Sequence, residues 1–286
     1  MVSGAELPAV KALAGAAKEA LNDADEKQQL LELAKHSPTM QLAAETLARR
    51  IAVKQAILLK LYMPLAAMLG IGKAYFADQF ATDLADHVSE IPDEHLTTPP
   101  SSVALPAMQG LAFSLEEPDL KEMYLKLLAA ASDDRRPYDA HPSFAQIICE
   151  LSSNEARLLQ WCLSRVHHPI FRVKFMTAPN AWQALKYNVM DWPDDGPPLL
   201  DEVNARSAYV DNWVRLGLVE INYTEFLGHT PPSSDPYGYV EHRPDYPTVD
   251  SVRDENGQPQ PFPSVAFDKG VLRVTDFGQR FLRAIS

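Results

Sequence analysis

The stretch EPDLKEMYLKLLAAASDDRRPYDAHPSF, from Glu117 to Phe144, decides how the middle of this chain folds. Its apolar side chains recur at the spacing of one helix face. They are Leu120, Met123, Tyr124, Leu127, Leu128 and Ala131. Pro118 suits the first turn of such a helix, and Pro137 prevents the helix from continuing. The stretch therefore predicts a buried helix, then a turn, then a second helix that begins near Pro142.

The corner, residues 133–142 between these two helices, concentrates polar side chains. Its candidate site residues are Asp133, Asp134, Asp139, His141 and Pro142. The acids and the imidazole could hold a metal ion or transfer protons. They could instead end one helix and cap the next, with Pro142 at its first position and with Arg135 and Arg136 as partners for the acids. We favour this structural interpretation and predict no catalytic residue, no metal ligand and no cofactor.

The chain before this stretch is rich in helix-forming residues. Residues 1–96 are predicted to form a helical N-terminal region, and a proline-rich connector then leads to a central helical core at 97–151. The segment SSVALPAMQGLAFSL is typical of a helix with Pro106 in its first turn. Its apolar face comprises Ala104, Ala107, Met108, Leu111, Ala112 and Leu115.

From Ser152 onward, the predicted elements follow the order helix, strand, helix, helix, strand, long loop, strand and helix. Ser152 and Glu155 have the spacing of a capping box. The segment AWQALKYNVM, residues 181–190, is predicted to be a short helix, and residues 224–268 form a long proline-rich acidic loop. The strand at 218–223 is expected to pair antiparallel with residues 271–275.

This order is that of a winged helix with an enlarged wing. The predicted fold is therefore mainly α, with a helical N-terminal and central bundle. A winged-helix-like α+β part with a small antiparallel sheet follows at residues 152–286.

Charge argues against nucleic acid as a partner. The chain of 286 residues has a formal net charge of -12, whereas nucleic-acid binding depends on Lys and Arg that neutralise phosphates. The predicted recognition helix, residues 201–216, carries three acids and two bases. Two cysteines, Cys149 and Cys162, lie in apolar helical patterns and fit a reducing compartment. Because the N-terminus lacks the pattern of a signal peptide, we expect a cytoplasmic protein.

One segment raises the question of a membrane. Residues 56–72 are strongly apolar, but the uncharged run between Lys60 and Lys73 is only 12 residues long. A spanning helix needs about 20 residues, and Pro64 would kink it. We favour a buried core helix and keep an inducibly inserting helix as the alternative.

The block from Ile91 to Trp161, which contains AMQGL, LKEMYLKLLAAASD, AHPSF and LSSNEARLL, resembles the Abi-alpha (abortive infection alpha) family. YVDNWVRLGLVEI and GVLRVTDFGQRFLRAIS near the C-terminus also resemble the family, so the likeness covers residues 55–286. The resemblance implies a bacterial, cytoplasmic protein of phage defence. It implies no catalytic residues, and the long acidic loop departs from the family pattern.

These observations favour a non-enzymatic phage-defence protein that contacts a phage or host protein. One alternative is a membrane-active effector that uses the apolar helix at 56–72. Another is a winged-helix transcription regulator. A hydrolase or nuclease that uses the corner is the least favoured hypothesis. The sequence leaves self-association open.

Overall fold

The computed structural model describes residues 54–65 except 55 and 59, residues 75 and 76, and residues 79–286 with five gaps. The gaps are 179–180, 194–199, 229–234, 239–256 and 259–264. The side chains of residues 177–178, 200–204 and 265 also lie outside this description. Predictions for residues 1–53 therefore concern a part of the chain beyond the described residues. The chain divides into two compact units between Glu94 and His95.

The first unit contains the apolar segment and α5, Phe80–His87. Leu58, Tyr62 and Leu65 are buried. The ring of Tyr62 meets that of Phe80 edge-on, with 5.1 Å between the ring centroids. The described residues between 56 and 65 are helical with one buried face, as expected for a helix that packs on a core, and residues 59 and 66–72 lie outside the described residues. Within the described ranges, no helix has the length and apolar character needed to cross a bilayer.

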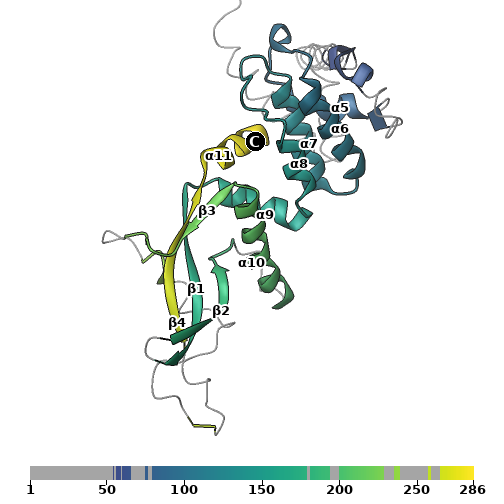
Figure 1. Ribbon diagram of the computed structural model, residues 1–286. Coiled ribbons are helices and arrows are strands. Elements are labelled where there is room, and N and C mark those ends of the chain that lie inside the picture. Colours follow the sequence, from purple (N-terminus) through teal and green to yellow (C-terminus); the bar gives the residue numbers. More distant parts are fainter. Residues whose placement is uncertain are drawn as a thin grey trace, which may run out of the picture. The chain divides into compact units, whose positions relative to one another are not determined.

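The second unit begins with a layer of helices, visible in Figure 1. A short 3-10 helix, η1, precedes them, and the division between the units falls within it. These elements are η1 (Asp93–His95), α6 (Ser101–Phe113), α7 (Pro118–Ala131), α8 (Phe144–Cys149) and α9 (Ser153–Leu163). Every side chain expected on the apolar face of α7 is buried, as are four of the six expected on α6. The helical periodicity of the sequence therefore located this core.

A glycine allows α6 and α7 to pack closely. A Cβ added at Gly110 would lie 2.3 Å from the hydroxyl oxygen of Tyr124, and Tyr124 is fully buried in α7. Pro106 lies at the sixth position of α6, not in the first turn where it was expected. Its missing N–H removes one bond to the carbonyl of Ser102, an exposed residue, so water can satisfy that carbonyl.

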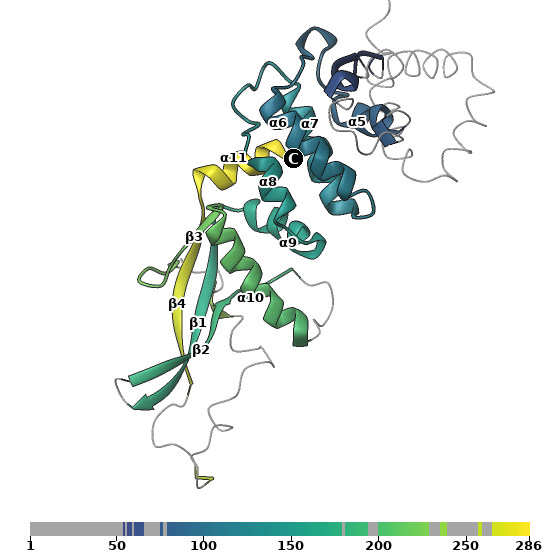
Figure 2. The same ribbon diagram turned by 45° about the vertical axis from the view of Figure 1, so that its right-hand side comes forward.

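A four-stranded antiparallel sheet follows the helices, with the strand order β2-β1-β4-β3. The strands are β1 (His167–Ala178), β2 (Ala181–Val189), β3 (Val219–Asn222) and β4 (Val265–Val274). The predicted pairing of residues 218–223 with 271–275 is confirmed, with Val219 opposite Val274 and Ile221 opposite Leu272. In Figures 1 and 2, the turn end of the β1–β2 hairpin points away from helices α6 to α8.

The winged-helix prediction is wrong. Residues 181–190 were expected to form a short helix before the recognition helix, but Ala181–Val189 is strand β2. This strand pairs with β1 from Ala178 opposite Ala181 to Phe171 opposite Val189. Pairing along a neighbouring strand overrides the helix-forming composition of the segment. A β-hairpin therefore separates α9 from α10 (Leu200–Arg215). In a winged helix, the element directly before the recognition helix would be another helix.

The described parts of the predicted loop at 224–268 include part of a strand and a buried residue. The last four residues of the loop belong to β4. Tyr237 is buried against Phe171, Val173 and Val189, and its hydroxyl donates a hydrogen bond of 2.8 Å to the carbonyl of Gly270. The described parts of the loop therefore cover one face of the sheet.

The hydroxyl group of Thr275 links the end of α10 to the start of α11 (Asp276–Ala284) by hydrogen bonds. The hydroxyl of Thr275 donates to the carbonyl of Gly217 at 2.7 Å and accepts the N–H of Gly278 at 2.9 Å. It therefore caps α11 and ties its start to the end of α10. Gly217 has a φ of 73°, which a glycine adopts without strain.

Candidate functional site

Asp133 opens the corner and is almost fully buried, with 3% of its surface exposed. Its carboxylate accepts hydrogen bonds from Nε of Arg135 at 2.8 Å and from Nη2 at 2.7 Å. These bonds from Arg135 hold the pKa of Asp133 below its ordinary value, although burial opposes the shift. Asp133 is therefore a charged structural group that already has a bidentate partner.

Asp134 turns the other way and meets the connector before α6. Its Oδ1 lies 2.8 Å from Nδ1 of His95, and its backbone N–H donates to the carbonyl of His95. Beside it, the N–H of Thr97 donates to the carbonyl of Ser132 at 2.9 Å. Asp134 thus fastens the start of the second unit to the end of α7.

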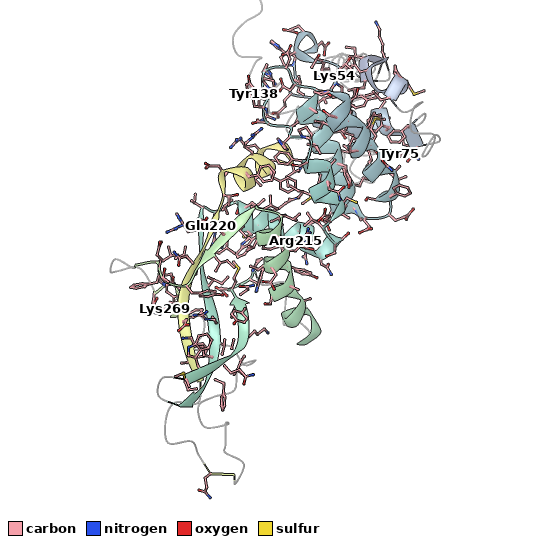
Figure 3. The ribbon with its side chains drawn as sticks, in the orientation of Figure 1. Lys54, Tyr75, Tyr138, Arg215, Glu220 and Lys269 are labelled. Carbon is pink, nitrogen blue, oxygen red and sulfur yellow. The ribbon has the colours of Figure 1, made fainter. Side chains whose placement is uncertain are left out.

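Asp139 faces the C-terminal helix. Its carboxylate lies 3.6 Å from Nε of Arg136 and 3.4 Å from Nε of Arg283 in α11. A second arginine of α11, Arg280, donates to the backbone carbonyl of Tyr138. Figure 3 shows Tyr138 at the surface of this region, and 79% of its surface is exposed. The corner is therefore joined to α11.

His141 lies at the start of α8. Its Nδ1 is 2.7 Å from the hydroxyl oxygen of Ser143 and accepts the backbone N–H of the same residue at 3.2 Å. Its ring packs against the rings of Phe144 and Phe277, each 5.6 Å away between centroids. Pro142 is exposed and precedes Phe144, the first residue of α8, by two positions. The expected first helical position for Pro142 is therefore wrong by two residues.

The four titratable residues of the corner do not converge on a common point. Each has its own partner: Arg135 for Asp133, His95 for Asp134, Arg283 for Asp139 and Ser143 for His141. Across the described ranges, no group of three or more His, Cys, Asp or Glu side chains could hold a metal ion. The arrangement joins η1, α7, α8 and α11.

Glu155, which the sequence identified only as part of a helix cap, is buried between α9 and α10. The capping box is present, with the hydroxyl of Ser152 accepting the N–H of Glu155 at 3.3 Å. The Glu155 carboxylate also accepts a bond of 2.7 Å from Nδ2 of Asn212 in α10. Burial raises the pKa of Glu155, and the bond from Asn212 only partly offsets this effect. Arg215, which also bonds to Asn212, pairs with Glu150. Figure 3 labels Arg215.

The sheet carries a group of stacked charges and rings that sequence reasoning missed. The guanidinium of Arg172 lies 4.8 Å from the ring centroid of Trp182 and 4.9 Å from that of Tyr223. Nζ of Lys174 lies 4.4 Å from the Trp182 centroid. Both cations bind Asp268 of β4 at 2.6 Å. Burial acts to raise the pKa of Asp268, but the bonds from Lys174 and Arg172 lower it below its ordinary value.

Strand β2, which contains Trp182, exposes three large apolar side chains. Trp182, Leu185 and Tyr187 are 42%, 51% and 47% exposed. With Arg172 and Lys174 of β1, these three residues form what we call the hairpin surface. One sequence signal could have drawn attention to it: residues 167–189 contain three bases and no acid in a chain with 38 acids.

Comparison with known proteins adds a family match. The model of a family described as abortive infection alpha matches residues 72–285. The matched range covers α5, the corner, all four strands, and the whole of α11 with its C-terminal cap. A search of curated proteins found no match, and a search of solved structures also found none.

Proposed function

We propose a defence role for this chain, which belongs to the abortive infection alpha family: it acts against phage infection through contact with another protein and without catalysis. Membership of the family associates the chain with abortive infection. The match over residues 72–285 is the observation that carries the defence role.

The corner supports a role without catalysis. A general acid or base needs a free proton position within reach of a substrate. Here the carboxylates of Asp133 and Asp139 are bound by arginines, and Nδ1 of His141 is bound by Ser143. These side chains hold helices together, and this structural role accounts for them without catalysis.

The hairpin surface supports protein contact. Protein interfaces are enriched in Trp, Tyr and Arg at their centres, and all three occur within this surface. Duplex DNA is a poor candidate because the net charge is -12. The helix-turn-helix of a winged helix is also absent from the described residues, since strand β2 stands where its first helix was expected.

The membrane-active alternative remains a prediction for the apolar helix. In the described part of that helix, Leu58, Tyr62 and Leu65 face a core rather than solvent, so membrane insertion would first require the core to open. Leakage of liposomes by the purified protein, abolished by Leu65→Asp, would support this alternative over the protein-contact proposal.

A phage challenge tests the proposal. Cells with and without the gene are infected with a broad phage panel, and escaper phages are isolated and sequenced. We expect protection against at least one phage, with escaper mutations that alter a phage protein. Absence of protection across the panel would contradict the defence role. Escape by changes confined to non-coding DNA would contradict protein contact.

A further inference from the structure

We infer that the hairpin surface binds an acidic segment of the partner protein. This inference rests on the proposed function and specifies the chemistry of the partner. The surface combines a half-exposed indole, a half-exposed phenol and an aliphatic side chain with two cations that lie against the indole ring. Large rigid rings beside positive charge are suited to apolar side chains that alternate with carboxylates.

Charge favours an acidic occupant. Residues 167–189 contribute Arg172, Lys174 and Lys186 and no acid, while the whole chain has 26 Lys and Arg against 38 Asp and Glu. Two carboxylates meet the hairpin: Asp268 binds Arg172 and Lys174, and Asp211 of α10 accepts a hydrogen bond from Asn188 of the hairpin. The hairpin is therefore a positive region on a negative molecule, and such a region steers an acidic partner to one place.

Single-stranded nucleic acid fits this surface less well. Bases can stack on an exposed indole, but the backbone needs a row of accessible cations. Arg172 and Lys174 lie two positions apart on β1 and converge on the same carboxylate of Asp268, so they do not form an extended row. A longer strand would also extend onto a protein with a net charge of -12. A short acidic segment meets only the local positive field.

A second copy of the chain and simple strand addition are also disfavoured. Two hairpins in contact would bring like charges together. Strand β2 forms the edge of the sheet within the described residues, but its register against β1 shifts between Phe171 and Val173 and again between Val173 and Lys174. Such irregular edges oppose backbone pairing. The contact is therefore made through side chains.

Fluorescence anisotropy on the full chain tests the inference. The probe is a short fluorescein-labelled peptide in which Glu and Leu alternate, titrated at low ionic strength. We expect saturable binding to the wild type and about tenfold weaker binding to Trp182→Ala and to Lys174→Gln. Binding should weaken as salt is added, because the exposed charges are then screened. The matched control is Tyr138→Ala, an exposed aromatic residue outside the surface, which should bind like the wild type.

Three outcomes would overturn the inference. They are no binding of the Glu–Leu peptide to the wild type, equal binding of that peptide to Trp182→Ala and the wild type, and tighter binding of a matched peptide in which Lys and Leu alternate. Tighter binding of a labelled oligothymidine would assign the surface to nucleic acid. Concentration-dependent dimers lost in Trp182→Ala would assign it to a second copy. Unchanged thermal melting of each variant shows that the fold is intact.

The phage assay separates this inference from the proposed function. If the peptide binds but the gene gives no protection, the defence role fails while the surface stands. If the gene protects and Trp182→Ala protects equally well, the defence role stands and the surface is not the contact used.

Discussion

At the scale of single residues, the buried carboxylate of Glu155 gives the first prediction. Its pKa in the folded state is raised by burial above 4.5, so the ionised form is penalised in the fold. Stability should therefore increase as the pH falls from 7 through this raised pKa toward 4.5. Glu155→Gln should lack this gain and cost less than about 1 kcal/mol at pH 7, because Gln also serves in a capping box.

Urea denaturation at pH 7 and pH 5 measures both quantities. Glu155→Ala is the control that removes the acceptor altogether, leaving Asn212 and the N–H of Ser152 without their partner. It should cost about 1–3 kcal/mol at both pH values. A Gln variant as unstable as the Ala variant would contradict this account.

Asp133 gives the opposite dependence on pH. Its pKa is lowered below 3.8, first by the hydrogen bond from Arg135. The stability that the ionised form contributes is therefore complete above 3.8 and is lost as the pH falls through the lowered pKa. Asp133→Asn should destabilise the protein by about 2 kcal/mol at pH 7. In denaturation measured at several pH values, the two proteins should converge below 3.8, and a constant difference would refute the assignment.

At the scale of elements, the start of α11 depends on a glycine. A Cβ at Gly278 would lie 2.2 Å from the carbonyl oxygen of Leu218, a backbone atom that cannot move aside cheaply. Gly278→Ala should therefore separate α11 from the end of α10 and destabilise the protein by about 1–3 kcal/mol. Thermal melting measures the loss. Gly228→Ala, where a Cβ would meet nothing within 4 Å, should melt like the wild type.

The elements also show what a sequence can reveal. The faces of α6 and α7 were predictable because Met108, Leu111 and Leu127 lie on regular helical stripes that are buried. Strand β2 was not, because Ala181–Val189 exposes most of its side chains and contains residues that favour helices. Its structure comes from pairing with β1, which a local pattern does not contain.

The corner was predictable as a turn between two helices, but the partners of its side chains were not. Asp139 meets Arg283 and Asp134 meets His95, and both contacts link residues far apart in the sequence. No local spacing encodes such contacts. The hairpin surface was missed for a related reason: its rings and cations gather only when β1, β2 and β4 lie side by side.

At the scale of the whole molecule, the division between Glu94 and His95 predicts that residues 95–286 fold without the first unit. The second unit has its own helical core and its own sheet, and its size is sufficient for independent stability. A chain beginning at His95 should unfold cooperatively in urea and protect its β1 and β4 amides from hydrogen exchange. Loss of cooperativity would show that the first unit is required.

A second truncation tests whether residues 95–100 stabilise the corner. Starting at Ser101 instead removes the His95–Asp134 pair, the bridge between Leu96 and Asp133, and the bond from Thr97 to Ser132. Because these contacts hold the corner, the shorter chain should unfold at a lower urea concentration. Its loss of hydrogen-exchange protection should concentrate at the C-terminal end of α7. Equal stability of the two chains would mean that the corner is held by α11 alone, through Arg280 and Arg283.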